Sequence, residues 1–498
     1  MTYDDDETRW ILLRYAGEVS IKSPKTKQRF TKRLSQNVRN ALGTTGARYR
    51  IEREWHRMLV ESAPPLALDS LPQVSGLQSV TPIRRVAWRD MAGLVGQAEA
   101  AFAQAVRGKR FAVRARRAGK TQLIPFRSAD LQCALGTALL EHASRVDLST
   151  PEVTVYLEVY PEQAYLFTEM VPAEGGLPVG VQGRALSLVS GGFDSAVASW
   201  MLLRRGVSLD YLFCNLGGIA HRRGVLRVMK VLADLWSYGE RPHLYEVDFQ
   251  PVVEEIQAKV LPKYWQVVLK RLMLRAGERL ARELELEALV TGDSVGQVSS
   301  QTLQNMAVVS RATQLALLRP LVGMNKEEII ALARRIGTYE RSAEVEEYCG
   351  LAPANPSTKA SFPTVEVEEG RLYPSLRDRV FASRIVHELR AIELEEAPSS
   401  DVEVEAIPEG TVAVDLRSRA AYEAWHAPDA LHLDYARALT AYPAFGREQS
   451  YVLYCEVGFK SAYLAELMRK SGFRACHVAG GVRTLLARAP AGHVDFLL

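Results

Sequence analysis

The sequence predicts a multidomain protein that combines α/β and α+β folds. At 498 residues the chain is long enough for roughly three or four domains, each with its own core. From about residue 176 to residue 393, strand-like runs alternate with helical patterns, which is typical of a doubly wound parallel sheet. The residues before 172 instead form two small α+β patterns, and a short α/β pattern resumes at residue 411.

The two α+β segments span residues 1–62 and 63–171. Both mix short strand-like runs with amphipathic helical patterns. In the first we expect strands at 10–15, 48–55 and 58–61 and a helix at 29–42. In the second we expect helices at 91–106 and 130–145 and strands at 110–116, 153–160 and 163–168.

Apolar runs in the central segment, residues 176–393, predict the strands of the parallel sheet. They lie at residues 186–189, 209–215, 243–248 and 288–291. Residues 394–410 are rich in acidic side chains and contain a Pro-Ser-Ser sequence, so we expect a flexible linker there. The last domain is then expected to span residues 411–498.

The composition is that of an ordinary globular protein, with 47% hydrophobic and 24% charged residues. No apolar run approaches the roughly 20 residues of a membrane span, and the first residues lack the pattern of a secretory signal. We therefore expect a cytoplasmic protein without a membrane partner. The 5 cysteines are scattered and none forms a Cys-x-x-Cys pair, which argues against a disulfide framework and a structural zinc site. No metal ligand is assigned.

Two basic stretches distinguish the first 130 residues, although the net charge is only +4. Residues 101–129 and 21–33 are rich in Lys and Arg and contain no Asp or Glu. Such clusters favour a polyanion as ligand, and a nucleic acid is the simplest candidate; the alternative is a solvated basic face. The predicted nucleic-acid-binding residues are Arg110, Arg114, Arg116, Arg117 and Lys120.

The hexapeptide SGGFDS, residues 190–195, lies between a predicted strand and a predicted helix. It fits neither the lysine-containing phosphate loop nor the dinucleotide fingerprint. It is still suited to an anion, because Gly191 and Gly192 permit close backbone approach and a helix begins beside them. Asp194 suits a divalent cation between itself and a phosphate, or a role in ordering the loop. The alternative is a plain Gly-Gly turn.

Cys455 is expected in a loop between a strand and a helix, where backbone amides and the helix dipole favour a thiolate. A phosphatase of the Cys-x5-Arg type would need Arg at position 461, and this chain has Ser461. Sulfur transfer therefore fits the cysteine loop better. The other cysteines considered, Cys133, Cys214 and Cys476, have apolar neighbours in the sequence and are expected to be packing residues.

The SGGFDS loop resembles the signature of the PP-loop ATP pyrophosphatases, which cleave ATP between its α and β phosphates while adenylating a carbonyl oxygen. Four further stretches extend the resemblance to the tRNA 4-thiouridine synthases, the tRNA uracil 4-sulfurtransferases. They are FCNLGG at 213–218, VLKR at 268–271, TGDSVGQVSSQ at 291–301 and LRPL at 318–321. The resemblance implies ATP and Mg²⁺ as cofactors.

The same resemblance implies which residues contact the nucleotide. Asp194 would be needed for adenylation, and Asp293 stands where the family often has Glu. The implied nucleotide-binding residues are Leu188, Val189, Ser190, Gly191, Gly192, Asp194, Ser195, Phe213, Cys214, Lys270, Gly292 and Gln301.

The Cys455 loop, together with VDLR at 414–417 and HVAGGV at 477–482, resembles a rhodanese domain. Rhodaneses carry sulfur as a persulfide on the loop cysteine, which would be Cys455; an inert rhodanese-like domain is the alternative. Lys460 occupies a position where rhodaneses commonly have Arg. Cys349, in EYCG at 347–350, resembles the family cysteine that forms a disulfide with the rhodanese cysteine during turnover.

The basic strand and loop at 111–120 resembles a THUMP domain, and residues 9–62 resemble the ferredoxin-like domain that precedes it in this family. The implied architecture has ferredoxin-like and THUMP N-terminal domains, a doubly wound parallel-sheet PP-loop domain and a C-terminal rhodanese-like α/β domain. Its arginine-rich edges would bind phosphates and set register on a tRNA.

The resemblance implies a tRNA sulfurtransferase that makes 4-thiouridine, with tRNA and a cysteine desulfurase as partners. A relay of sulfur to a small carrier protein for the thiazole of thiamine is the alternative, and it would need the rhodanese-like domain alone. A tRNA-binding protein with inactive domains is a third hypothesis, which the intact loops at 190–195 and 455–461 disfavour.

Overall fold

The computed structural model describes residues 9–43, 46, 48–63, 69–345, 355–374, 380–382, 384–393, 402–456 and 458–488. The chain forms two compact units, one built largely from the residues before 183 and the other from the residues that follow. None of the helices in the described ranges is both long and apolar enough to cross a membrane.

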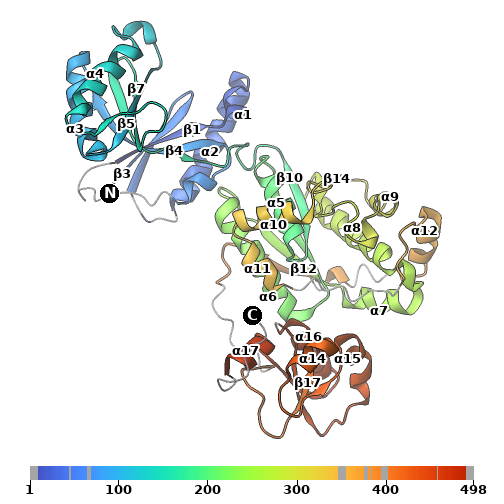
Figure 1. Cartoon of the computed structure of the whole chain (residues 1–498). Coiled ribbons are helices and arrows are strands. Elements are labelled where there is room, and N and C mark those ends of the chain that lie inside the picture. The colour runs from blue at the N-terminus through green and yellow to red at the C-terminus, as the bar shows by residue number, and fades with distance from the viewer. Residues whose placement is uncertain are drawn as a thin grey trace. The chain divides into compact units, whose positions relative to one another are not determined.

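The first unit is built on a nine-stranded sheet with the order β2-β3-β1-β4-β8-β7-β5-β6, and β9 pairs with β4. The strands are β1 (Arg9–Tyr15), β2 (Arg48–Arg53), β3 (Arg57–Ala63), β4 (Leu77–Ala87), β5 (Arg110–Arg117), β6 (Arg145–Val146), β7 (Val153–Val159), β8 (Gln163–Phe167) and β9 (Val171–Pro172). The helices are α1 (Gly17–Ser20), α2 (Pro24–Gly43), α3 (Met91–Val106) and α4 (Ser128–Leu140). Phe30, Leu34 and Val38 give α2 a buried face, while α3 and α4 cover the sheet beside β5 (Figure 1).

Strand β4 is a long strand that the sequence pattern did not reveal. Its residues from Leu77 to Ile83 pair with β1, and those from Arg84 to Ala87 pair with β8. One strand therefore belongs to both halves of the sheet, and no break in the sheet falls at residue 62. Pro82 and the irregular burial of β4 hide the alternation by which strands are recognised. The domain boundary at residue 62 stays a prediction.

The sheet of the central segment, residues 176–393, has the order β14-β13-β10-β11-β12-β15. The strands β10 (Arg184–Val189), β11 (Ser208–Asn215), β12 (His243–Asp248), β13 (Ala288–Val290) and β14 (Ala316–Leu318) run parallel. An antiparallel edge strand, β15 (Ile385–Glu388), adds to the parallel sheet that the sequence predicts.

The helices of this segment are α5 (Phe193–Leu203), α6 (Gly218–Trp236), α7 (Gln250–Lys259), α8 (Trp265–Glu283), α9 (Leu303–Ser310), α10 (Lys326–Arg335), α11 (Tyr339–Glu344) and α12 (Phe362–Gly370). The strand order proceeds from β10 to β11 and β12 on one side and to β13 and β14 on the other. The order thus reverses between β10 and β13, and open parallel sheets bind ligands at the carboxyl ends of the strands at such a point.

The C-terminal segment contains a parallel five-stranded sheet with the order β16-β20-β19-β17-β18. Its strands are β16 (Glu403–Val404), β17 (Val412–Asp415), β18 (Leu431–His432), β19 (Ser450–Tyr454) and β20 (Arg474–Val478). Its helices are α14 (Arg419–Ala424), α15 (Tyr435–Ala441), α16 (Phe459–Lys470) and α17 (Val482–Arg488), and α16 packs against β19 and β20 (Figure 1). Because Cys455 follows the central strand β19, the fold presents it at the sheet's carboxyl edge.

Candidate active site

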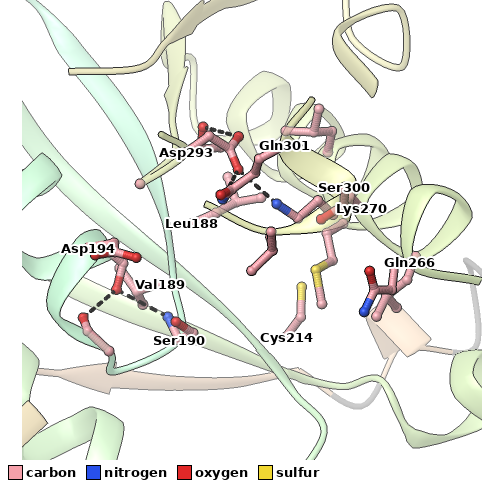
Figure 2. A pocket seen from close by; sticks show the side chains of 18 of the residues that line it. Leu188, Val189, Ser190, Asp194, Cys214, Gln266, Lys270, Asp293, Ser300 and Gln301 are labelled. Atoms are coloured by element: carbon pink, nitrogen blue, oxygen red, sulfur yellow. Dashed lines mark hydrogen bonds and ion pairs between the residues drawn. The ribbon is translucent and has the colours of Figure 1, made fainter. Parts of the chain in front are cut away.

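A cavity of about 340 Å³ lies at the carboxyl ends of β10 and β13, in the size range of small-molecule sites. The predicted nucleotide-binding residues that line it are Leu188, Val189, Ser190, Gly192, Asp194, Ser195, Cys214, Lys270, Gly292 and Gln301. Figure 2 shows Asp194 and Ser190 on one side of the cavity and Asp293, Gln301 and Lys270 on the other. Gly191 and Phe213 do not line the cavity, although both lie close to residues that do.

The loop at 190–195 is held by its own hydrogen bonds. The amide of Ser190 donates to Ser195 Oγ at 3.4 Å, and Ser195 Oγ donates to the carbonyl of Gly192 at 3.2 Å. Gly191 has a φ of 83°, a conformation that favours glycine. The turn therefore leads into α5 with the helix's first amides at the cavity, where an anion is stabilised.

Gly292 allows a second segment to approach this loop. A Cβ added at Gly292 would lie 2.7 Å from the carbonyl carbon of Asp194 and 2.8 Å from the amide nitrogen of Ser195. Both of these are backbone atoms, so only glycine fits at position 292 without displacing the loop. The TGD sequence after β13 is thus explained by packing against the SGGFDS loop.

Asp194 is bound through both carboxylate oxygens. Lys326 Nζ lies 2.9 Å from Oδ1, and Gln297 Nε2 donates to Oδ2 at 2.7 Å. Lys326 is the first residue of α10, which Asn325 caps at its amino end. The loop itself has no lysine, and this structure brings one to it from more than 130 positions further along the chain. No sequence motif near Lys326 signalled that role.

Asp293 is the centre of a buried polar cluster. Its Oδ1 accepts from Lys270 Nζ at 2.8 Å and Gln301 Nε2 at 3.0 Å, and its Oδ2 accepts from Thr291 Oγ1 at 2.9 Å and Arg319 Nε at 3.3 Å. Burial opposes ionisation, but Lys270 and these hydrogen bonds outweigh it and hold the pKa of Asp293 well below its ordinary value. With four donors on its carboxylate, Asp293 positions Lys270 and Gln301 toward the cavity.

His221, in the first turns of α6, is a cavity residue that the sequence analysis missed. Its Nε2 lies 3.0 Å from the carbonyl oxygen of Ser190, and its ring meets the buried ring of Phe213 edge to face at 4.9 Å. Burial lowers the pKa of His221, which keeps the imidazole neutral, with Nε2 as the donor to Ser190. Phe213 therefore supports the wall of the cavity from behind.

The cavity is chemically suited to a nucleotide. Leu188, Leu212, Leu269 and Met273 give it an apolar wall, which would accept a base. Gln301 Oε1 is buried without a hydrogen-bond partner, so it offers a free acceptor for an amino or hydroxyl group of a ligand. The α5 amides and Lys326, which pairs with Asp194, lie on the opposite side, which is suited to an anion. Among the residues that the structure describes, no cluster of three or more His, Cys, Asp or Glu is arranged to hold a metal ion.

Cys455 lies at the start of the loop before α16, and its sulfur contacts residues of this loop and of the helix. The amide of Gly458 donates to Cys455 Sγ at 3.2 Å, and Ser461 Oγ lies 3.5 Å from the same sulfur. Hydrogen-bond donors to the sulfur stabilise a thiolate, whereas burial opposes it, so the thiolate stays a prediction. Cys455 is fully buried, with 0% of its surface exposed. In this structure the sulfur is therefore not accessible to another molecule.

The remaining cysteines differ in their surroundings. Cys349 lies outside the described residues. Cys214 is buried and lines the cavity, and Cys476 is partly buried in β20. Cys133 is exposed on α4, so the expectation that it is a packing residue was wrong: it lies on the outer face of the helix, while Leu131 and Leu135 face the core.

The predicted nucleic-acid-binding residues lie on β5 and the loop after it. Arg114, Arg116, Arg117 and Lys120 are exposed. Arg116 also pairs with the buried Glu158 at 2.8 Å. Arg110 is the most tightly engaged, since it pairs with Asp147 at 3.1 Å and Glu152 at 3.2 Å.

In the other basic stretch, residues 21–33, Lys27 is buried. Lys27 is only 2% exposed, and its Nζ lies 4.7 Å from the ring centroid of Trp55. It therefore holds the β2–β3 turn to α2 rather than adding to a basic face.

Comparison with known protein families gives matches to four consecutive segments. They are the ThiI ferredoxin-like domain at residues 10–81, the THUMP domain at 89–169, the thiamine biosynthesis protein (ThiI) at 180–373 and the rhodanese-like domain at 401–487.

Individual proteins match over almost the whole chain. A protein named tRNA sulfurtransferase from Pyrobaculum aerophilum is 37% identical over 467 residues, which are 93% of this chain and 96% of the relative. One of the same name from Proteus mirabilis is 35% identical and covers 93% of this chain and 98% of the relative. A crystal structure of a 4-thiouridine synthetase–RNA complex with bound ATP is 31% identical, with a TM-score of 0.69 over 76% of this chain and 99% of that chain.

A ferredoxin-like and THUMP unit joined to a PP-loop domain and a rhodanese-like domain defines a sulfurtransferase of the tRNA-modifying class. The chain belongs to the ThiI family of tRNA sulfurtransferases. The predicted family and fold class are thereby confirmed.

Proposed function

We propose that this protein is an ATP-dependent tRNA uracil 4-sulfurtransferase that converts a uridine of tRNA, position 8 in the family, to 4-thiouridine. The observation that supports this most directly is the presence of two complementary centres in one chain. The cavity beside the SGGFDS loop is suited to a nucleotide, and Cys455 is held by the Gly458 amide as a sulfur carrier would be. tRNA and ATP meet in the cytoplasm, which is the location we propose.

The cavity residues would prepare the uracil for substitution. The apolar wall and Gln301 would hold the base of ATP, and the amides at the start of α5 would hold its phosphates. Lys326 would offset the charge on the leaving pyrophosphate, and Lys270 would contact the nucleotide from the side of Gln301. The uracil O4 would attack the α phosphorus, which releases pyrophosphate and leaves AMP on C4 as a good leaving group.

Mg²⁺ belongs to this proposal as the usual companion of a nucleotide. Magnesium sites commonly use one or two carboxylates together with substrate phosphates. Asp194 is the carboxylate beside the loop, and it would hold the ion there. The ion would supply charge neutralisation for the pyrophosphate.

Cys455 would deliver the sulfur. A cysteine desulfurase would load it as a persulfide, whose outer sulfur would attack C4 while AMP leaves. The Cys349 thiolate would then attack the Cys455 sulfur, which frees 4-thiouridine and leaves a Cys349–Cys455 disulfide. A dithiol reductant would restore both thiols by taking up the disulfide's two oxidising equivalents. The role of Cys349 rests on the sequence resemblance alone.

The test is mass analysis of tRNA nucleosides from a strain that carries Cys455→Ala as its only copy of this protein. We expect 4-thiouridine to disappear from the tRNA. Normal 4-thiouridine in that strain would overturn the proposed sulfur route.

Transfer of sulfur to a thiamine sulfur-carrier protein is a second candidate, which the description of the matching ThiI family favours. It would require Cys455 and not the nucleotide cavity. Asp194→Ala separates the two activities, because tRNA thiolation should stop while sulfur transfer to the carrier continues.

A further inference from the structure

Helices α6 and α16 of the second unit contact each other, and this contact has no role in the chemistry proposed above. Helix α16 begins directly after the Cys455 loop, and α6 begins directly after β11 at the cavity. Glu466 on α16 accepts a hydrogen bond from the amide of Ile219, the second residue of α6, at 3.3 Å. Burial raises the pKa of Glu466, and the hydrogen bond from this amide opposes that effect.

Gly218 makes this close approach possible. A Cβ added to it would lie 2.5 Å from Glu466 Oε2 and 3.5 Å from a ring carbon of Tyr463. Gly218 also has a φ of 68°, in the left-handed region. The first turn of α6 is thus shaped to receive the side of α16.

An ion pair forms a second, separate contact between the same two segments. Arg223, one turn further along α6, lies 2.8 Å from Glu403 on β16. Both side chains are partly exposed, with exposed fractions of 28% and 22%. Glu403 also lies 3.8 Å from His477 Nε2 on β20, the strand next to it. Since Glu466 and Glu403 come from different elements, two independent contacts fix the same face.

This face is connected to both reactive centres. On one side, Leu216 and His221 flank Gly218 in the sequence and line the nucleotide cavity. On the other, Ser461 of α16 contacts Cys455 Sγ, and the helix rise from Ser461 to Glu466 is only about 8 Å. A displacement of α16 on α6 would therefore move the cysteine loop relative to the cavity wall.

We propose that the amino-terminal turns of α6 form a docking surface for the C-terminal domain, and that Glu466 and Glu403 are positioning residues that set the Cys455 loop for sulfur transfer. The proposal rests on the proposed function, because it assigns this surface to the delivery step between the two centres. The docked partner is the chain's own rhodanese-like domain. Glu466 binds an amide at the N-terminus of α6, and Glu403 pairs with Arg223.

The first test uses a charge exchange in the full chain, with Arg223→Glu, Glu403→Arg and the double variant. Three readouts are compared: 4-thiouridine formed in tRNA, pyrophosphate released in the presence of tRNA, and persulfide loaded on Cys455 by a desulfurase. We expect each single variant to lose about tenfold in 4-thiouridine formation while the other two readouts stay within about twofold. The double variant should recover most of the loss, because the pair is restored in reverse.

The second test uses two single substitutions at Glu466 and leaves the Arg223–Glu403 ion pair unchanged. Glu466→Gln keeps an acceptor for the Ile219 amide and should retain most of the thiolation rate. Glu466→Lys places a cation at the positive end of α6 and should lower that rate about tenfold. Full thiolation by Arg223→Glu and Glu466→Lys, or no recovery in the double variant, would overturn the docking surface. An unsubstituted chain that forms no 4-thiouridine would instead refute the proposed function.

Discussion

Lys326 Nζ lies 2.9 Å from Asp194 Oδ1, so the phosphate loop obtains from α10 the lysine that its own sequence lacks. Asp194 orients the lysine, and α5 and α10 pack together to hold the two residues in place. A cation in this position offsets negative charge as a pyrophosphate departs.

Lys326→Ala should therefore reduce tRNA-dependent pyrophosphate release by about 100-fold, with little change in the persulfide loading of Cys455. Lys326→Arg should retain part of the activity, because the charge remains while the geometry changes. The measurement is pyrophosphate release at saturating ATP and tRNA. Full activity in Lys326→Ala would show that the lysine only anchors Asp194.

Gly292→Ala should distort the SGGFDS loop, since the added methyl group would press on the backbone of Asp194 and Ser195. We expect at least a tenfold loss of ATP affinity and a decrease of about 1–3 kcal/mol in the free energy of unfolding. Gly323→Ala is the matched control, because a Cβ at Gly323 meets nothing within 4 Å. Equal effects of the two substitutions on ATP binding would contradict the packing argument.

Glu246 makes the second unit sensitive to acid. Burial alone would raise its pKa, but hydrogen bonds from His387, Arg222 and Asn215 lower the pKa of Glu246 to about 2 from an ordinary 4.5. A lowered pKa in the folded state adds stability above the ordinary pKa, and that stability is lost as the pH falls toward 2.

Glu246→Gln should consequently lower the free energy of unfolding at pH 7 by up to about 3 kcal/mol and flatten its dependence on pH between about 5 and 2. Denaturant unfolding across this pH range measures both effects. Glu254→Gln is the control, because Glu254 is exposed on α7. An unchanged pH profile in Glu246→Gln would contradict the assignment.

The basic residues of β5 and of the loop after it should separate into two groups. Arg116→Ala and Lys120→Ala should weaken tRNA binding and reduce its salt dependence, because both side chains are exposed and would lose a phosphate contact. Arg110→Ala should mainly lower stability, because it breaks the pairs with Asp147 and Glu152. Binding isotherms at several salt concentrations, together with thermal unfolding, distinguish the groups. A larger binding loss for Arg110→Ala than for Arg116→Ala would reverse this division.

The sequence predicts those parts of the fold whose causes are local. The helix at Met91–Val106 was predicted with its correct ends because its residues follow a helical pattern, and the structure shows that Asp90 caps it. The strands before the SGGFDS and Cys455 loops were recognised as apolar runs. Strand β4 was missed because its pairing partners, β1 and β8, are distant in the sequence and determine its structure.

The residues of the candidate site also fall into two groups, those that the sequence predicts and those that only the structure reveals. Loop residues such as Ser190 and Asp194 could be recognised because the motif is contiguous and its chemistry follows from adjacent atoms. Lys326 and His221 could not, because each enters the site through the packing of a helix that begins far from the loop. The burial of Cys455 was equally inaccessible to sequence analysis, since it depends on how its loop closes on the rest of its domain.

A single-turnover experiment tests the central claim most directly. The full chain, with Cys455 already loaded as a persulfide, is mixed with ATP and tRNA, and pyrophosphate and 4-thiouridine are counted together. We expect one pyrophosphate for each 4-thiouridine, neither product in Asp194→Ala, and pyrophosphate without 4-thiouridine in Cys455→Ala. Formation of 4-thiouridine without pyrophosphate release, or by the Cys455→Ala variant, would contradict the account.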